Sequence, residues 1–183
     1  MQATKLDVFE VIQKRKSARA YETKPVSKEI LGKILEAGSL APSAKNIQPW
    51  HFIVVTDKNK RKALSKGLYA KFLSEVPAVI VLCGDQEASP DWYIVDVALA
   101  GENMILAATN EGLGTCWVGS FDEKDIQSLL GIPSNLRVVA LMAVGYAKEK
   151  ESIAKRILSR VQRRKKLTEI TSWEMYGKAL EGN

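Results

Sequence analysis

The chain has 183 residues, of which 46% are hydrophobic and 26% are charged, and its formal net charge at pH 7 is +6. These values are typical of a globular chain, and they predict one domain over residues 1–183 or one subunit whose core a partner completes. No apolar run approaches the roughly 18 residues of a membrane span, and the start MQATKLDVFE does not resemble a signal peptide, so we expect a cytoplasmic protein without membrane contact.

The first distinctive segment follows a short stretch in which Leu6, Phe9 and Ile12 recur at helical spacing. It holds three cations and one hydroxyl group, namely Arg15, Lys16, Ser17 and Arg19. Alternate side chains of an extended segment share a face, so the two arginines and the serine can converge on one ligand. Arginine matches the geometry of a phosphate group, and serine adds a neutral donor. Taken alone, such a segment is more often a solvated basic turn than a binding site.

The next part of the chain predicts a core-facing helix and then an ordered loop. Ser27 can cap the helix, Gly38 ends it, and its apolar residues recur at helical spacing. Residues 40–51 contain Pro42 and Pro49, which exclude a continuous helix there. The loop leads directly into a β-branched run that predicts a strand up to Thr56.

The middle of the chain predicts a strand between two helices. Asp57 opens a lysine-rich helix whose apolar spacing continues through Leu73 towards Pro77. Residues 78–83 are apolar without alternation, as expected of a central strand covered on both faces. Residues 92–112 predict a helix that is apolar most of the way round, which indicates burial in the core or at a subunit interface.

The last patterned segments predict two more strands, at residues 115–119 and 137–146, separated by a helix that Asp122 caps. Strands that alternate with helices favour a mixed α/β or α+β sandwich. Beyond Lys148 the chain is basic and weakly patterned until Trp173, whose position near the end suggests docking onto another surface.

Cysteine and histidine usage argues against a metal site or a side-chain nucleophile. Cys83 and Cys116 each lie in a predicted strand, which favours free buried thiols. His51 is the single histidine, and neither cysteine belongs to a CxxC pair. We therefore expect no metal and no Cys–His catalytic pair, and we interpret Trp50 and His51 as packing residues.

Five pieces of the sequence, taken in order, resemble the FMN-dependent nitroreductase family over nearly the whole chain. They are RKSAR at 15–19, APSAKNIQPWHF at 41–52, GLGTCWVG at 112–119, VGY at 144–146 and LTEITSW at 167–173. The resemblance implies an α+β sandwich in which helices flank a central mixed, mostly antiparallel sheet. It also implies an intertwined homodimer with FMN at the subunit interface, in which the C-terminal segment from about residue 160 to residue 183 wraps the partner.

The resemblance further implies which residues bind the cofactor. The N-terminal cations and hydroxyl group would hold the phosphate, the ribityl chain and the pyrimidine edge, with Arg19 near flavin N1 and O2, where its charge would raise the reduction potential. The loop residues would contact the flavin from the opposite subunit, and two backbone N–H groups would approach N5 and O4. The loop residues are Pro42, Ser43, Ala44 and Asn46; the backbone donors are those of Val118 and Gly119.

A second pair of phosphate-binding cations is implied at Arg164 and Lys165. Lys166 stands where the family commonly has proline, which leaves the register of these cations open. We interpret Gln48 as structural. At the position of Ala44 the family often has a small or hydroxyl-bearing residue. The methyl group of Ala44 cannot donate the hydrogen bond that a hydroxyl group would.

The implied reaction is a ping-pong transfer in which NAD(P)H delivers hydride to flavin N5 and a nitroaromatic, quinone or similar acceptor then takes the electrons. No side chain needs to act as a nucleophile or general base. One alternative is a specialised flavin-fold relative, either a flavin-fragmenting or a dehalogenating enzyme. Another is a basic nucleic-acid-binding module, which the absence of aromatic residues between Lys155 and Lys166 disfavours.

Overall fold

The computed structural model describes residues 7–148 and 164–179. The chain divides into two compact units, residues 1–148 and residues 149–183. A single domain over residues 1–183 stays a prediction. Within the described ranges, no helix combines the length and the apolar character needed to cross a membrane.

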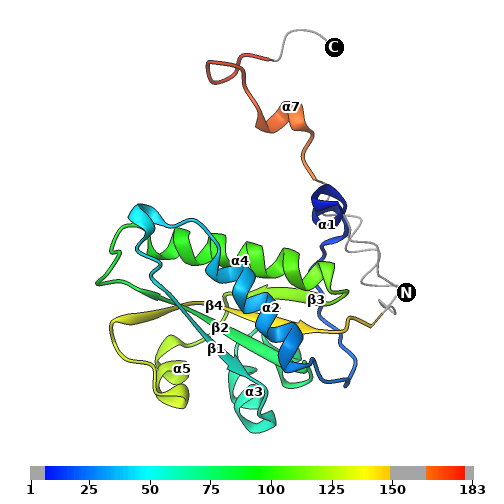
Figure 1. Ribbon diagram of the computed structural model, residues 1–183, viewed down its shortest axis with the longest axis vertical. Coiled ribbons are helices and arrows are strands. Elements are labelled where there is room, and N and C mark those ends of the chain that lie inside the picture. The colour runs from blue at the N-terminus through cyan, green and yellow to red at the C-terminus, as the bar shows by residue number, and fades with distance from the viewer. Residues whose placement is uncertain (1–6, 149–163, 180–183) are drawn as a thin grey trace. The chain divides into compact units, whose positions relative to one another are not determined.

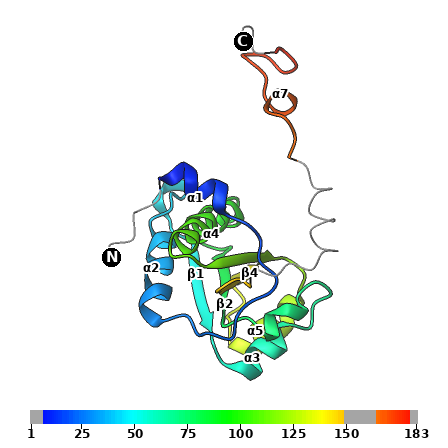
Figure 2. The same ribbon diagram turned by 90° about the vertical axis from the view of Figure 1, so that its right-hand side faces the viewer.

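A four-stranded sheet in the order β1-β2-β4-β3 forms the centre of the first unit (Figure 1). The strands are β1 (Trp50–Val55), β2 (Ala78–Asp85), β3 (Gly114–Val118) and β4 (Leu136–Gly145). All neighbouring strands pair antiparallel, and a parallel pairing occurs as an isolated bridge between Ser17 and Thr115. Helices cover both faces of the sheet, which confirms the predicted α+β sandwich (Figure 2).

The central strand β2 explains why its sequence shows no polar alternation. Val79 and Val81 point into the core on the side of α3 and α5, whereas Ile80 and Leu82 point into the core on the side of α2 and α4. All four side chains are fully buried. A strand covered on both faces needs apolar residues at every position, because successive side chains point to opposite faces.

Two helices cover the first face of the sheet, α2 (Lys28–Ser39) and α4 (Tyr93–Asn110). The predicted cap of α2 is confirmed, since the backbone N–H of Ile30 donates to Ser27 Oγ at 3.2 Å. Asn103 of α4 ties the two helices together, because its Nδ2 donates to the carbonyl oxygen of Ala37 at 3.2 Å. Where the helices meet, Gly38 leaves the space that Met104 fills.

The second face carries α3 (Lys58–Leu64), the short 3₁₀ helix η2 (Lys71–Ser74) and α5 (Glu123–Leu130). The single helix predicted from Asp57 towards Pro77 is therefore wrong, because α3 ends at Leu64. Beyond that end the backbone packs closely against the chain after β3, since a Cβ at Gly67 would collide with the carbonyl group of Ser120. Leu73 is still fully buried, but it reaches the core from η2.

The N-terminal helix α1 (Val8–Lys14) turns most of its apolar residues outwards. Phe9 and Ile12 are 63% and 47% exposed, whereas Val11 is buried. Leu6, which the same spacing included, lies outside the described residues. His51 is exposed on β1, which corrects its interpretation as a packing residue, whereas Trp50 stacks on Phe52.

The described part of the second unit is short and contains α7 (Leu167–Ile170). All of its described residues are exposed, including Trp173. The contact of this segment with a partner subunit stays a prediction.

An ion pair between α5 and β4 fixes one end of the second layer. Arg137 donates to both carboxylate oxygens of Glu123, from Nε at 2.8 Å and from Nη2 at 2.7 Å, and the backbone N–H of Val138 donates to Glu123 Oε1 at 2.8 Å. The hydrogen bonds from Arg137 hold the pKa of Glu123 below its ordinary value of 4.5, against the opposing effect of burial. The charged form of Glu123 thus stabilises the fold.

We predict that Glu123→Gln lowers the free energy of unfolding at pH 7 by about 1–2 kcal/mol, because the charge-assisted bonds are weakened. A lowered pKa in the folded state gives stability that is present above pH 4.5 and is lost as the pH falls through the folded-state value. The difference between the two proteins should therefore shrink in acid. Urea unfolding at pH 7 and pH 3 measures both effects.

Glu29→Gln is the matched control, because Glu29 pairs with Lys33 on an exposed helix surface. Its loss should destabilise the fold much less than the loss of Glu123, because solvent screens an exposed pair. Equal losses in the two variants, or a difference that does not depend on pH, would contradict the role of Glu123.

Candidate functional site

The segment that carries the N-terminal cations lies along the open edge of the sheet. The backbone N–H of Ala18 donates to the carbonyl oxygen of Thr115 at 2.8 Å, and the N–H of Glu22 donates to the carbonyl oxygen of Tyr146 at 2.9 Å. The hydroxyl group of Tyr21 closes the turn by donating to the carbonyl oxygen of Ala18 at 2.6 Å. Burial raises the pKa of this phenol, so it stays a neutral donor. The basic segment is therefore a fixed part of the sheet and not a solvated turn.

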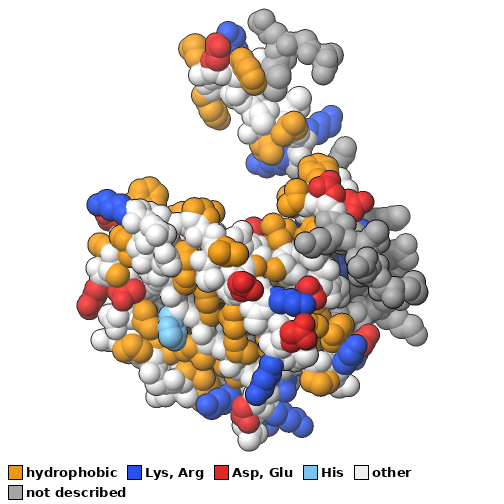
Figure 3. All heavy atoms as spheres, viewed as in Figure 1, with side chains coloured by type: hydrophobic (Ala, Val, Ile, Leu, Met, Phe, Trp, Pro, Cys, Tyr) orange, Lys and Arg blue, Asp and Glu red, His pale blue; other side chains and the backbone are white. Residues whose placement is uncertain are grey.

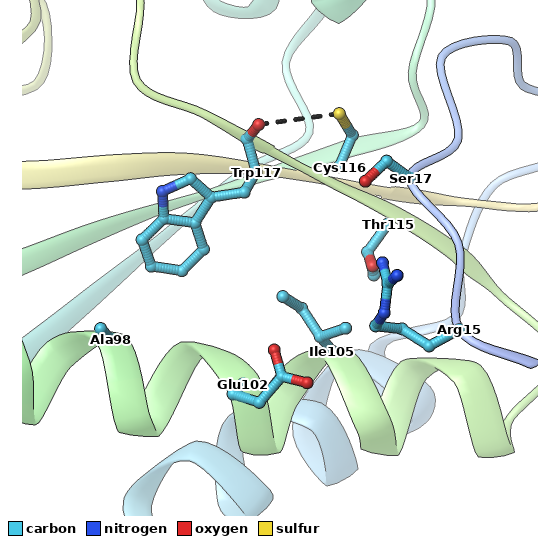
Figure 4. Close-up of a pocket in the computed structure, with 8 residues that line it drawn as sticks. All are labelled: Arg15, Ser17, Ala98, Glu102, Ile105, Thr115, Cys116 and Trp117. Carbon is cyan, nitrogen blue, oxygen red and sulfur yellow. Dashed lines mark hydrogen bonds between the residues drawn. The ribbon is translucent and has the colours of Figure 1, made fainter. Parts of the chain in front are cut away.

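A pocket of about 330 Å³ opens between this segment, β3 and α4 (Figure 4). Its volume lies near the lower end of the range for small-molecule sites, roughly 300–1,000 Å³. The lining residues come from three parts of the chain. They are Arg15 and Ser17 of the basic segment, Ala98, Glu102 and Ile105 of α4, and Thr115, Cys116 and Trp117 of β3.

The lining combines one cation, hydroxyl groups and apolar side chains. Figure 4 shows the guanidinium group of Arg15 directed towards Ser17 and Thr115, with the carboxylate of Glu102 rising from α4 beside it. The ion pairs among the described residues lie elsewhere and involve neither Arg15 nor Glu102. Arg15 therefore keeps its donors available for an anion.

Trp117 forms the aromatic side of the pocket. Its ring lies against Gly101 of α4, where a Cβ would collide with it. The side chain is 38% exposed, so part of the ring faces the pocket. A glycine at this position of the helix thus allows an aromatic surface to lie beside the cation and the hydroxyl groups.

Two of the predicted N-terminal residues line the pocket, Arg15 and Ser17, whereas Lys16 and Arg19 do not. Both of the latter are exposed. The charge of Arg19 acts on Tyr21 and on Cys116 in the direction that lowers their pKa values, although burial outweighs it at both. Arg19 is therefore close enough for its charge to act on these groups, although it does not line the pocket.

The predicted backbone donors lie at the end of β3. Val118 is buried, whereas Gly119 is exposed, and a Cβ placed at Gly119 would meet no atom within 4 Å. A flat ligand can thus approach the main chain at Gly119. Arg164 and Lys165 are exposed in the second unit. Their binding of the cofactor phosphate stays a prediction.

The predicted loop between α2 and β1 is ordered and held by specific hydrogen bonds. The backbone N–H of Ala44 donates to Asp96 Oδ1 at 3.1 Å. The backbone N–H of Gln48 donates to Ser43 Oγ at 2.9 Å, and its side-chain Nε2 donates to Asn46 Oδ1 at 3.0 Å. Gln48 thus acts within the loop, in line with its interpretation as structural.

The loop and the pocket lie on different sides of α4. At about 100° per residue, Ala98, Glu102 and Ile105 point roughly 180–240° around the helix from Asp96, which holds the loop. Figure 1 shows the loop between α2 and β1 at the N-terminal end of α4. Within one chain, a ligand in the pocket therefore cannot also touch Pro42, Ser43 or Ala44.

The sequence motifs do not predict that Glu102 and Ile105 of α4 line the pocket. A usable signal was present, because Asp96 and Glu102 are the only charged residues between Trp92 and Asn110. A charge in an otherwise apolar helix indicates a polar task. Here one carboxylate holds the loop and the other lines the pocket.

The two cysteines are free and buried, as predicted. Burial raises the pKa of Cys83 to about 11 and also raises the pKa of Cys116. Neither thiol is thus prepared to act as a nucleophile. The described residues hold no cluster of three or more metal-binding side chains.

Comparison with known proteins gives one consistent family. The family model "Nitroreductase family" matches residues 12–78 and 64–146. A protein of Archaeoglobus fulgidus is 37% identical over 153 residues, which cover 79% of this chain and 88% of that protein. The NADH dehydrogenase of Thermus thermophilus is 30% identical over 181 residues, with 79% and 88% covered.

A solved structure supports the same relationship. The FMN-dependent nitroreductase from Clostridium difficile R20291 superposes with a TM-score of 0.72 at 34% identity, and the match covers 85% of this chain and 97% of that one. Two specialised enzymes are each 27% identical to this chain. The match to the 5,6-dimethylbenzimidazole synthase of Rhodospirillum rubrum covers 78% of this chain and 83% of that protein. The match to the iodotyrosine deiodinase of Thermotoga neapolitana covers 76% of this chain and 88% of that protein.

We predict that neither thiol of the folded protein reacts with a chromogenic disulfide reagent within minutes at pH 8, because both are buried and protonated. In denaturant, two thiols per chain should react at once, in line with the two cysteines of the sequence. A stoichiometric reaction in the native protein would show that Cys116 is accessible from the pocket.

Proposed function

This chain belongs to the nitroreductase family, and we propose on that basis that it is an FMN-dependent NAD(P)H oxidoreductase that works as a homodimer. The proposed acceptors are nitroaromatics, quinones or similar small molecules. The observation that carries the proposal is the pocket in which Arg15 and Ser17 meet β3, because two of the family-like sequence pieces come together there.

The side chains present fit FMN chemically. The guanidinium group of Arg15 and the hydroxyl group of Ser17 suit a phosphate dianion. Trp117 and Ile105 supply the apolar surface that an aromatic ring system needs, and Glu102 can accept hydrogen bonds from the hydroxyl groups of a ribityl chain.

When bound, FMN would supply hydride chemistry at N5, between NAD(P)H and the acceptor. The chain's own task is to bind, orient and exclude water. The backbone at Gly119 is open to a flat ligand, and the charge of Arg19 lowers the pKa of Cys116, a residue of the pocket, against the larger effect of burial. No protein nucleophile is required, which agrees with two buried thiols and a single, exposed histidine.

The separation of the loop from the pocket supports a homodimer. If Ser43 and Ala44 contact the cofactor, they must do so in another copy of the chain, because α4 stands between them and their own pocket. The outer surface of α1 and α4 is also unusually apolar. Its exposed residues include Phe9, Ile12, Ile94, Val95 and Leu99.

Figure 3 shows hydrophobic side chains among the surface atoms over the part of the unit where Figure 1 places α4. A cluster of exposed apolar side chains is typical of a protein–protein interface. We infer that a second copy of the chain covers this surface.

The specialised activities of the 27% identical relatives are the second candidate, and the fold gives a reason to rank them lower. The segments with room for a substrate lid are residues 64–76 and 85–92. Ala70 and Leu73 of the first are fully buried in the core. The second is closed by Asp85, whose carboxylate accepts the backbone N–H groups of Glu87 and Ala88.

The nucleic-acid alternative depends on a basic block in the second unit. Arg156, Arg160 and Arg163 of this block lie outside the described residues. The pocket and the family support the oxidoreductase, and neither supports a nucleic-acid-binding module.

We predict that the purified protein is yellow or takes up one FMN per chain, and that NADH or NADPH bleaches it without oxygen. A nitroaromatic or quinone should restore the colour, and sedimentation should give twice the mass of 20.2 kDa. A colourless protein that cannot be loaded with FMN, or a monomer that turns over fully, would contradict the proposal.

We predict that Arg15→Ala weakens FMN binding about 10- to 100-fold, because it removes a charge-assisted contact to the phosphate. Riboflavin lacks the phosphate, so its affinity should not change. Lys14→Ala is the matched control, since it removes a neighbouring exposed cation at the end of α1. Quenching of flavin fluorescence measures all of these affinities, and equal losses for FMN and riboflavin would exclude phosphate binding by Arg15.

A further inference from the structure

Asp96 is a buried carboxylate on α4 whose task the oxidoreductase chemistry does not explain. Its residue is 3% exposed, and its Oδ1 accepts the backbone N–H of Ala44 at 3.1 Å. Its Oδ2 is also buried and has no hydrogen-bond partner among the described residues. Burial of a carboxylate is unfavourable, and here a single hydrogen bond compensates for it. We interpret this as a sign that the hydrogen bond has a function.

The loop that Asp96 holds has a strained backbone. Lys45, Asn46 and Gln48 have φ values of 51°, 56° and 53°, in the left-handed region that favours glycine. Three such residues within four positions persist only where the surroundings enforce the conformation. Strain of this kind is concentrated at sites that bind ligands.

The hydrogen bonds of the loop differ in what they connect. Those from Gln48 to Ser43 and Asn46 join the loop to itself. The bond from Ala44 to Asp96 joins the middle of the loop to a helix 52 residues further along the chain. Because α4 is packed into the core, this bond transfers the rigidity of the core to the loop.

The bond also determines which groups of the loop can reach a ligand. The N–H of Ala44 is occupied by Asp96, and its methyl side chain cannot donate. Ser43 Oγ accepts the N–H of Gln48, which leaves the hydroxyl hydrogen free to donate to another acceptor. Fixing Ala44 therefore fixes the direction of the neighbouring hydroxyl group.

We propose that Asp96 is a positioning residue that clamps the strained loop to α4 and so aims Ser43 at the cofactor bound by a second copy of the chain. This inference rests on the proposed function, because it takes FMN as the ligand. One helix then serves two sites, since α4 lines its own pocket with Glu102 and holds the loop for the other pocket with Asp96.

The test compares three variants of the full-length protein. Asp96→Ala removes the acceptor, and Asp96→Asn keeps a neutral, weaker one. Asn103→Ala is the matched control, because it removes a side-chain hydrogen bond of 3.2 Å that ties α4 to α2 away from the loop. The measurements are hydrogen exchange at the Ala44 amide and FMN affinity by fluorescence quenching.

In Asp96→Ala, the Ala44 amide should lose its protection. FMN affinity should fall about tenfold, because the loop must then be ordered when the ligand binds. Asp96→Asn should lie between this variant and the wild type in both measurements. Asn103→Ala should leave exchange at Ala44 unchanged and FMN affinity within about twofold, although its thermal stability should fall.

Unchanged exchange and affinity in Asp96→Ala would overturn the proposal. So would equal losses of FMN affinity in Asp96→Ala and Asn103→Ala, because these would reflect general stability. Should Asp96→Ala fail to fold, Asp96→Asn decides, and wild-type values in it would overturn the clamp. If the wild type binds no FMN, the proposed function fails by itself, and exchange at Ala44 still reports whether Asp96 holds the loop.

Discussion

The packing of α4 against the sheet is the constraint on which the rest of this structure depends. Its inner side is part of the core, where Val97 and Met104 are fully buried, and Gly101 accepts the ring of Trp117. Its outer side is apolar and exposed. Since one helix forms the core, a wall of the pocket and the support of the loop, small changes in its position would move all three together.

The second fixed element is the segment that lies along β3. Its backbone pairs with Thr115 and Tyr146, so the sheet itself sets the direction of Arg15 and Ser17. Cationic side chains on a mobile turn would lose conformational freedom on binding an anion. Here the sheet has already fixed the backbone that carries them, which favours binding of a phosphate-bearing ligand.

The proposed reaction needs no catalytic side chain, and the described residues agree with this. Burial keeps the thiols of Cys83 and Cys116 protonated, and the single histidine lies exposed on β1. What the chain offers is geometry: a cation, hydroxyl groups, an aromatic surface and open backbone. Such a set suits a protein that leaves bond making and breaking to a cofactor.

The sequence alone determined the elements, because their signals are local. The apolar run of β2, the caps at Ser27 and Asp122 and the amphipathic patterns of α2 and α5 each depend on neighbouring residues, and the structure confirms them. The helix after Asp57 was predicted too long, and beyond its end the backbone at Gly67 packs closely against Ser120, far along the chain. The spacing of apolar residues along the chain cannot predict contacts between distant segments.

Only the tertiary structure decided which residues share a site. The motif around Arg15 gave two lining residues, but Glu102 and Trp117 join them because α4 and β3 fold against the same segment. The pairing of Ala44 with Asp96 is likewise invisible in sequence, because it joins a loop to a helix across 52 positions. Local patterns predict secondary structure, whereas a pocket and its support arise from contacts between segments that only the folded chain brings together.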